Sequence, residues 1–281
     1  MNIHAHAKIN LGLHIVGKRT DGYHEINTIF HRIGLYDEIT FQHHSSIELT
    51  CTNPTIPLDS KNLCWRAAEL LQKVLEISNG VKIEILKNIP VGAGLGGGSS
   101  DAAAVLRHLP TFWNTSVDET ILEQLALQLG SDVPYFLKNS TAYAEGRGEK
   151  LSYFQFQLPY WIVLVYPNIH VSTPWAYKTL SEKRNGVFNE QQDFIRLFLE
   201  SPLQNIRSLK NDFEEVVLSE YPVIAETKNK LNSSGAHHAL MSGSGSSVFG
   251  LFKDKQKAEY AAQQFDKTYF VHITEPDFII K

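Results

Sequence analysis

The chain has 281 residues, which is long enough for one large domain or two smaller ones with an ample hydrophobic core. Hydrophobic residues make up 43% of the sequence and charged residues 20%, as in an ordinary soluble globular enzyme. The formal net charge of -4 is unlike the strongly basic domains that usually bind nucleic acid, so we expect no nucleic-acid partner.

The cysteine content, the lengths of the apolar runs and the first residues all bear on the cellular location. Cys51 and Cys64 are the only cysteines of the sequence, too few for a disulfide framework and without CxxC metal-site spacing. No apolar run approaches the roughly 18–20 residues that cross a bilayer. The first residues, MNIHAHAKIN, lack the basic start and apolar core of a secretory signal. We therefore expect a cytoplasmic protein with no membrane partner.

The first third of the chain alternates between strand-like and helix-like patterns. Apolar and polar residues alternate with the period of two that predicts strands, and an apolar stripe at helical spacing predicts a helix with Ser60 as a candidate cap. The predicted elements are a strand over 1–16, a turn over 17–23, strand segments within 25–41, a helix over 63–75 and a half-buried strand over 81–85.

A glycine-rich loop, PVGAGLGGGSSD at 90–101, follows and runs into an alanine-rich helix. Glycines let a ligand approach the backbone closely, and a helix N-terminus presents unpaired N–H groups and a positive dipole end to an anion. The expected anion is a nucleotide phosphate. The absence of a lysine excludes a Walker A loop. Gly92, Gly94 and Gly97 match the dinucleotide fingerprint, but no second strand with an acidic residue follows; this interpretation and a plain linker remain the weaker alternatives.

The remaining elements are less regular and favour an α+β fold over the strict alternation of a Rossmann sheet. Gly130 is expected to end the first of the later helices, as glycine often does. The predicted elements are a helix over 118–129, a turn over 131–134, an extended segment over 135–144, a turn over 146–150, a strand over 161–166, helices over 212–221 and 222–231, a strand–turn–strand unit over 240–252, a helix over 254–265 and a strand over 269–273. We place a domain boundary between 1–155 and 156–281.

Three separated segments resemble the motifs of the GHMP small-molecule kinases: AKINLGLHIVGKRTDGYHEINTIF at 7–30, PVGAGLGGGSSDAAA at 90–104 and MSGSGSSVFGLF at 241–252. LGSDVPYFL at 129–137 and EGRGEKL at 145–151 also match one branch of that family. The resemblance implies a two-domain fold, with an N-terminal ATP-binding domain like domain 2 of ribosomal protein S5 and a C-terminal ferredoxin-like α/β sandwich. It further implies ATP as co-substrate, Mg²⁺, and a monomer or homodimer. The matched branch phosphorylates the 2-hydroxyl of a methylerythritol that carries a cytidine diphosphate tail.

By the same resemblance, Asp132 and Lys8 are the catalytic residues. A lysine within about 4 Å of a carboxylate is worth roughly 4 kcal/mol at an effective dielectric near 20, so it would hold the aspartate ionised. It could also stabilise the alkoxide that develops on the acceptor. Asp132 either takes the proton or only positions the hydroxyl, because a loose transition state needs little early deprotonation.

The resemblance also assigns two binding surfaces. Tyr23 offers an aromatic face for stacking on cytosine and His24 a polar edge, with Thr173 and Tyr177 as a second wall and Asn10 near the erythritol hydroxyls. The ATP-binding residues are Pro90, Val91, Gly92, Ala93, Gly94, Leu95, Gly96, Gly97, Gly98, Ser99 and Ser100.

Two other function classes stay open at this point. One is a kinase of another branch, acting on mevalonate or homoserine, against which Tyr23 and His24 argue. The other is a nucleotide-binding regulator without catalysis, against which Lys8 and Asp132 argue. None of the histidine pairs has the spacing of a zinc site, so no protein-held metal is predicted.

Overall fold

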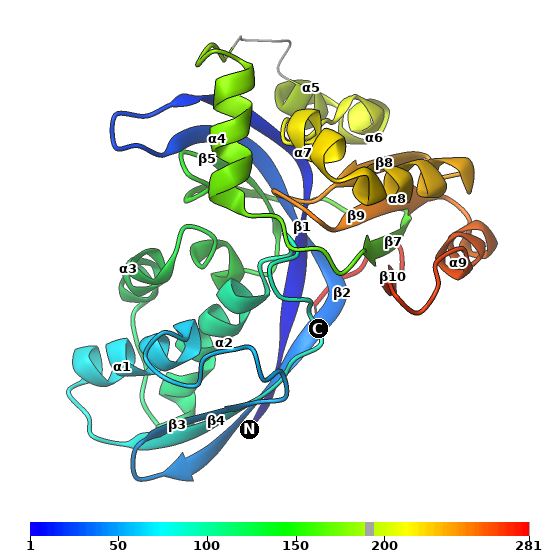
Figure 1. The fold of residues 1–281 in the computed structure, drawn as a ribbon. Coiled ribbons are helices and arrows are strands. Elements are labelled where there is room, and N and C mark those ends of the chain that lie inside the picture. The colour runs from blue at the N-terminus through cyan, green and yellow to red at the C-terminus, as the bar shows by residue number, and fades with distance from the viewer. Residues whose placement is uncertain (189–193, 281) are drawn as a thin grey trace. The chain divides into compact units, whose positions relative to one another are not determined.

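The structure is a computed structural model and describes residues 1–188 and 194–280 (Figure 1). The chain divides into two compact units that interleave along the sequence: residues 1–7, 35–91 and 96–139 form the first, and 8–34, 92–95 and 140 onward form the second. The predicted boundary between 1–155 and 156–281 remains a prediction, because units built from interleaved segments do not test a division into continuous domains.

Two long strands contribute residues to both units. Strand β1 covers Asn2–Lys18 and β2 covers His24–His44. Both are longer than predicted, and β2 is one continuous strand where the sequence predicts separate segments. Of the turn predicted over 17–23, residues 19–23 lie between the two strands, and residues 17 and 18 still belong to β1. Within the turn, Asp21 accepts a hydrogen bond from the backbone N–H of Tyr23 at 3.1 Å.

In the first unit, three helices pack together beside a small sheet. Strand β4 pairs antiparallel with the second half of β2 and parallel with β3. Figure 1 shows α1, α2 and α3 gathered on one side of β3 and β4. Val81, Ile83 and Ile85 are buried, as their alternation predicts. The elements of this unit are β3 (Ile47–Cys51), α1 (Leu63–Leu75), β4 (Gly80–Leu86), α2 (Gly97–Phe112), α3 (Glu119–Leu129) and the 3-10 helix η1 (Pro134–Leu137).

In the second unit, a four-stranded antiparallel sheet has the order β10-β7-β9-β8, and β5 pairs with both β2 and β6. The apolar core gathers strand residues such as Val163 and Val248 with helix residues such as Leu180, Val217 and Leu231. The elements are β5 (Thr141–Glu145), β6 (Lys150–Phe154), β7 (Trp161–Tyr166), α4 (Thr173–Lys183), α5 (Phe194–Glu200), α6 (Pro202–Asn205), η2 (Ile206–Ser208), α7 (Glu214–Glu220), α8 (Pro222–Ser233), β8 (His238–Met241), β9 (Val248–Phe252), α9 (Lys255–Gln263) and β10 (Phe270–Thr274).

Several sequence predictions are wrong in detail. Residues 135–144 are not one extended segment, because Pro134 starts a 3-10 turn and β5 begins only at Thr141. By contrast, the prediction that Gly130 ends α3 is confirmed; its φ of 167° is an extended conformation open to any residue rather than the left-handed one. Helix α4 was not predicted; Ser172 caps it and Pro174 lies in its first turn. The helices between 194 and 208 were not predicted either.

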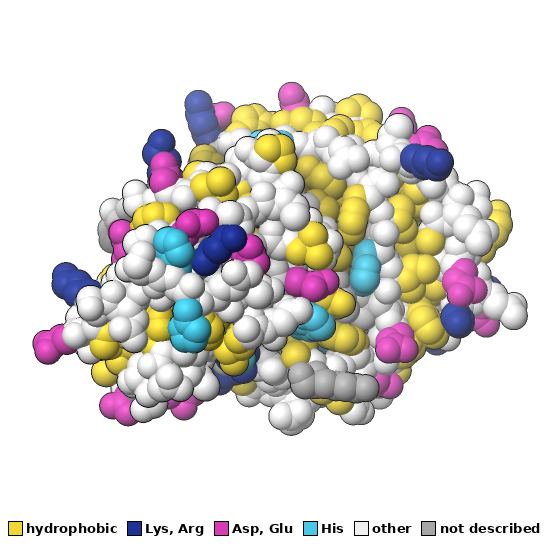
Figure 2. Space-filling view, turned by 90° about the horizontal axis from the view of Figure 1, so that it is seen from below, with side chains coloured by type: hydrophobic (Ala, Val, Ile, Leu, Met, Phe, Trp, Pro, Cys, Tyr) yellow, Lys and Arg dark blue, Asp and Glu magenta, His cyan; other side chains and the backbone are white. Residues whose placement is uncertain are grey.

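The lengths of the described helices and the distribution of surface charge are features of the molecule as a whole. None of their helices is both long and apolar enough to cross a membrane. On the face drawn in Figure 2, acidic and basic side chains are interspersed, and neither sign forms a continuous patch there.

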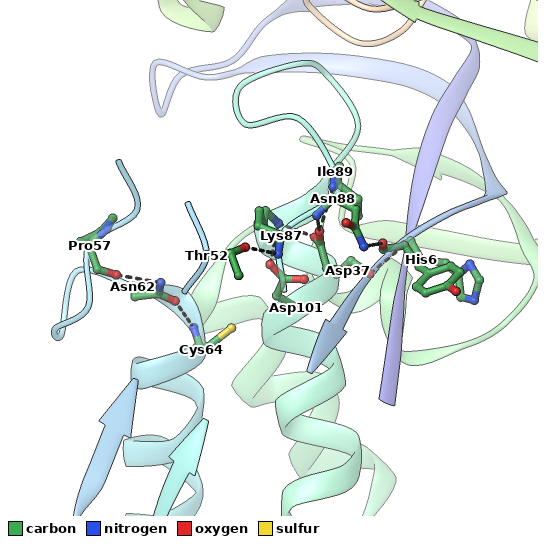
Figure 3. Close-up of polar contacts among 12 residues, drawn as sticks. His6, Asp37, Thr52, Pro57, Asn62, Cys64, Lys87, Asn88, Ile89 and Asp101 are labelled. Atoms are coloured by element: carbon green, nitrogen blue, oxygen red, sulfur yellow. Dashed lines mark hydrogen bonds and ion pairs between the residues drawn. The ribbon is translucent and has the colours of Figure 1, made fainter. Parts of the chain in front are cut away.

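The start of α1 corrects a predicted cap. Asn62, not Ser60, occupies the N-cap, and its Oδ1 accepts a hydrogen bond from the backbone N of Cys64 at 2.8 Å. Its Nδ2 also donates to the carbonyl oxygen of Pro57 at 2.9 Å. The side chain therefore ties the preceding loop to the helix (Figure 3).

We expect Asn62→Ala to lower the free energy of unfolding by about 1–2 kcal/mol, because it removes a cap and a second hydrogen bond. Ser60→Ala, at the position that the sequence wrongly favours, should change it by less than about 0.5 kcal/mol. Urea denaturation without nucleotide measures both. Equal effects of the two variants would contradict this assignment of the cap.

Candidate active site

The glycine loop alternates left-handed backbone with ordinary backbone. Gly92, Gly94 and Gly96 have φ values of 66°, 77° and 69°. Side chains rarely tolerate this region, so glycine is required at these three positions for conformational reasons as well as for ligand access. Of the predicted ATP-binding residues, 92–95 belong to the second unit, and 90–91 and 96–100 belong to the first.

The middle of the loop lies against the C-terminal glycine motif within the second unit. A Cβ on Gly94 would stand 2.2 Å from the carbonyl oxygen of Ser242, a distance that no side chain permits. The Ser242 hydroxyl donates to the carbonyl oxygen of Gly94 at 2.9 Å, and the Ser247 backbone N–H donates to that of Ala93 at 3.3 Å. Two motifs almost 150 residues apart therefore form one backbone contact.

Strand β1 carries Lys8 to this contact. Its backbone N–H donates to Leu95 at 3.0 Å, and its Nζ lies 3.5 Å from the carbonyl oxygen of Gly94. The ammonium also lies 4.9 Å from the centre of the Phe30 ring. The side chain is only 4% exposed, unlike an ordinary surface lysine.

Asn10 shares the strand face of Lys8, as the spacing of two predicts. Its Oδ1 accepts a hydrogen bond from Lys8 Nζ at 2.7 Å, and its Nδ2 donates to Thr28 Oγ1 at 2.8 Å. Its backbone N–H donates to the Ser242 hydroxyl at 3.1 Å. The buried amide therefore holds the lysine ammonium in place, and the predicted contact of Asn10 with the erythritol hydroxyls stays a prediction.

Helix α2 begins where the loop ends. Its N-cap residue, Gly96, has no side chain to bond the first N–H groups of the helix. The Ser100 hydroxyl turns inward and donates to the carbonyl oxygen of His6 at 2.7 Å. The first turn of a helix of 16 residues thus has no side-chain cap, a suitable arrangement for an anion.

A buried group of three charges, which the sequence analysis missed, anchors the strand end before the loop. Figure 3 shows the Lys87 ammonium between the carboxylates of Asp37 and Asp101; the Asp101 contact is 2.7 Å. Asp37 also accepts hydrogen bonds from the backbone N–H groups of Asn88 and Ile89, at 2.6 and 2.8 Å. One carboxylate therefore holds the two residues that precede Pro90. A lysine at the end of the strand over 81–85 was the only signal in the sequence.

Two carboxylates and one ammonium, if all were ionised, would leave one uncompensated negative charge in this buried group. Burial and the neighbouring Asp37 raise the pKa of Asp101 to about 8, against the opposing effect of Lys87. The carboxylates in turn hold the pKa of Lys87 above its usual range, although burial alone would lower it. Asp101 Oδ1 is buried without a hydrogen-bond partner. Burial and Asp37 therefore favour the protonated form of Asp101, whereas the ammonium of Lys87 favours the ionised form.

Asp132 lies half-buried in the turn between α3 and η1. The turn is closed by a hydrogen bond from the backbone N–H of Val133 to Gly130 at 3.2 Å. Asp132 belongs to the first unit and Lys8 to the second. As the sequence predicts, Asp132 lies in a turn and Lys8 lies on a strand.

Besides Asn10, the four other residues predicted for the acceptor also lie in the second unit. His24 stacks on Tyr177 with ring centres 4.5 Å apart and a 13° tilt, and its Nε2 lies 2.9 Å from Ser181 Oγ. Burial and nearby Lys18 lower the pKa of His24, so the ring is neutral at pH 7. Tyr23, immediately before it, is 56% exposed.

Thr173, the fourth of these residues, begins α4, the helix that also carries Tyr177. Its hydroxyl lies 2.7 Å from that of Ser244 in the C-terminal glycine motif. Among the described residues, no group of three or more His, Cys, Asp or Glu side chains is placed to hold a metal ion. Both cysteines are free thiols.

Two family models match the chain, and some of these features lie within the matched ranges. The GHMP kinases N terminal domain matches residues 62–140, and the GHMP kinases C terminal domain matches 194–271. The glycine loop and Asp132 lie in the first match, and the C-terminal glycine motif lies in the second. The chain therefore belongs to the GHMP kinases, and its two-domain α+β fold is the fold of that family.

Comparison with individual relatives shows to which branch of the GHMP kinases the chain belongs. The chain is 44% identical over 280 residues to 4-diphosphocytidyl-2-C-methyl-D-erythritol kinase of Prosthecochloris aestuarii, with 99% of this chain and 98% of the relative covered. A crystal structure of 4-(cytidine 5'-diphospho)-2C-methyl-D-erythritol kinase matches with a TM-score of 0.82 and 34% identity, covering 98% and 99%. The Methanococcus jannaschii mevalonate kinase shares the fold, with a TM-score of 0.73, 16% identity and 98% of both chains covered. Within the GHMP kinases, the chain thus groups with the 4-diphosphocytidyl-2-C-methyl-D-erythritol kinases.

We expect the buried charge group to make stability depend on pH. The pKa of Asp101 is raised in the folded state, so the folded protein keeps a proton that the unfolded chain loses between about pH 4 and pH 8. The free energy of unfolding should fall over this window by at most about 1.4 kcal/mol per pH unit from this group. Asp101→Asn, which mimics the neutral acid, should lack this component.

Urea denaturation of both proteins at pH 5 and pH 8 measures the difference. Asp118→Asn, an exposed aspartate whose side chain makes no cap hydrogen bond at α3, serves as the matched control. A constant difference between wild type and Asp101→Asn at both pH values would show that Asp101 does not titrate in this range.

Proposed function

We propose that the chain transfers the γ-phosphoryl group of ATP to the 2-hydroxyl of 4-diphosphocytidyl-2-C-methyl-D-erythritol, a step of the non-mevalonate route to isoprenoid precursors. The observation that carries this proposal is the likeness over 99% of the chain to a kinase of that name. The arrangement of the glycine loop, Lys8 and the aromatic residues is compatible with each part of the reaction.

The loop is proposed to bind the phosphates of ATP. The uncapped first turn of α2 and the backbone N–H groups of the glycines offer donors and a positive dipole end to the phosphate oxygens. Phosphoryl transfer needs charge neutralisation and alignment more than covalent chemistry. Mg²⁺ would neutralise phosphate charge. Mg²⁺ usually keeps several waters and binds substrate phosphates with one or two protein ligands, so it would reach this chain together with the nucleotide.

Lys8 and Asp132 are proposed to act on the acceptor hydroxyl. Asp132 orients it and accepts its proton, and the Lys8 ammonium stabilises the alkoxide as the bond to phosphorus forms. The amide of Asn10 and the carbonyl oxygen of Gly94 hold the ammonium in place. We propose Asn10 as a positioning residue first. Its Oδ1 keeps a second lone pair with which to accept a hydrogen bond from an erythritol hydroxyl.

The acceptor's cytosine is proposed to lie against Tyr23 and His24. A neutral imidazole offers one donor and one acceptor to the polar edge of the base, and the exposed Tyr23 ring offers a stacking face. Tyr177 supports His24 from behind, and Thr173 lies at the start of the same helix. Because Tyr177 stacks on His24, we propose that it acts through the histidine rather than by direct contact with cytosine.

The alternatives have weaker support. A kinase acting on mevalonate or homoserine would share the fold, but the 16% identity to a mevalonate kinase indicates only a common fold. A regulator without catalysis would not need a buried lysine beside the glycine loop. The cytoplasmic location and the assembly as monomer or homodimer remain predictions.

Asp132→Ala and Lys8→Ala should each reduce kcat by about 10²- to 10⁴-fold, the usual contribution of a positioned acid, base or charge. Both proteins should still fold, because each substitution shortens one side chain without adding volume. Release of ADP in the presence of the cytidylated acceptor measures kcat. Asp118→Ala, an exposed aspartate at the start of α3, is the matched control and should keep full turnover. Turnover near wild type in Asp132→Ala would contradict its assigned function.

A further inference from the structure

Arg147 is a basic residue that lies over the Tyr23 ring. It lies at the tip of the hairpin between β5 and β6, and its guanidinium carbon lies 4.8 Å from the centre of the Tyr23 ring. The hairpin tip is tied to the start of β2: Gly146 donates to Glu25 Oε1 at 3.1 Å and accepts from the Ile26 backbone N–H at 2.8 Å. The position of Arg147 over Tyr23 is therefore built into the backbone.

The guanidinium keeps donor capacity. Within the described part of the chain, its one ion-pair partner is Glu149, whose Oε1 lies 3.8 Å from Nε, beyond hydrogen-bond distance. Glu149 instead accepts a hydrogen bond from the backbone N–H of Arg147 at 2.5 Å. Arg19, the other arginine near Tyr23, is committed to Asp21 at 3.1 Å and to Glu25 at 2.7 Å. Arg147 is thus the arginine that an incoming anion can engage.

The side chain can also be reached from solvent. Arg147 is 34% exposed, and the ring beneath it stays 56% exposed, so one face of Tyr23 bears the cation while over half of the side chain remains accessible. An arginine on one side of an aromatic ring and a stacked base on the other is a compatible arrangement, because both interactions use the electron-rich faces.

We propose that Arg147 is a specificity-determining residue that binds the diphosphate of the acceptor while the cytosine stacks on Tyr23. This inference rests on the proposed function. A base and its diphosphate are covalently linked through one ribose, so a base on Tyr23 brings its phosphates within reach of a neighbouring side chain. The planar guanidinium is suited to two oxygens of one phosphate. Lys18, close enough to lower the pKa of His24, adds a second positive charge near this surface.

The test compares the binding of cytidine diphosphate and cytidine by calorimetry, which does not depend on turnover. Arg147→Met keeps the length and the contact with Tyr23 but removes the charge. It should weaken binding of the diphosphate by about 10- to 100-fold, the loss of a hydrogen bond to a charged group, and change cytidine binding by less than about 3-fold. Arg147→Lys should fall between, because it keeps the charge without the bidentate geometry.

Lys150→Met, on the same hairpin, removes the same charge and should bind both ligands like the wild type. Equal weakening of both ligands in Arg147→Met, no weakening of the diphosphate, or a wild type that binds the two ligands equally, would each overturn the inference. Phosphorylation of the cytidylated acceptor by the wild type is followed on the same preparation. Its absence would contradict the proposed function, whereas turnover with an unchanged ligand preference in Arg147→Met would contradict only the function assigned to Arg147.

Discussion

The close approach of two backbones at Gly94 is the constraint on which the second unit's part of the site depends. The carbonyl oxygen of Ser242 occupies the place of a side chain at residue 94. Only glycine permits this contact, and it is secured by the Ser242 hydroxyl on the Gly94 carbonyl oxygen. The backbone N–H of Asn10 reaches the same hydroxyl, and the backbone of Lys8 is bonded to Leu95. Three sequence motifs are thus linked by a few short contacts between backbone and small side chains.

Two buried lysines serve different purposes around the loop. Lys87 forms ion pairs with Asp37 and Asp101. Asp37 also accepts hydrogen bonds from the backbone N–H groups of the two residues before Pro90. Removing one partner of such a buried group leaves a charge without compensation, which is costly. Lys8 is instead oriented by an amide and a backbone carbonyl oxygen. The first lysine shapes the loop, whereas the second is the one we assign to chemistry.

The sequence predicts the parts of this arrangement that depend on local patterns. Alternation predicts β4, helical spacing predicts α1 and α3, and the glycines predict an anion loop at a helix start. Prediction from the sequence fails where a contact between residues far apart in the chain determines the local structure. Asn62 rather than Ser60 caps α1 because the loop from Pro57 returns to it. The pairing of Lys87 with Asp37 joins positions 50 residues apart, and no local pattern reveals it. The stacking of His24 on Tyr177 joins residues that only the tertiary fold brings together, and no local pattern predicts it.

The central claim, that the chain is a kinase for a cytidylated methylerythritol, is tested most directly by its choice of acceptor. Purified protein is incubated with ATP and Mg²⁺ and, separately, with 4-diphosphocytidyl-2-C-methyl-D-erythritol, mevalonate or homoserine, and product masses and ADP release are measured. We expect one phosphoryl group to be added to the cytidylated acceptor, with release of an equal amount of ADP, and no product from the other two alcohols. Phosphorylation of mevalonate or homoserine without phosphorylation of the cytidylated acceptor would contradict the claim.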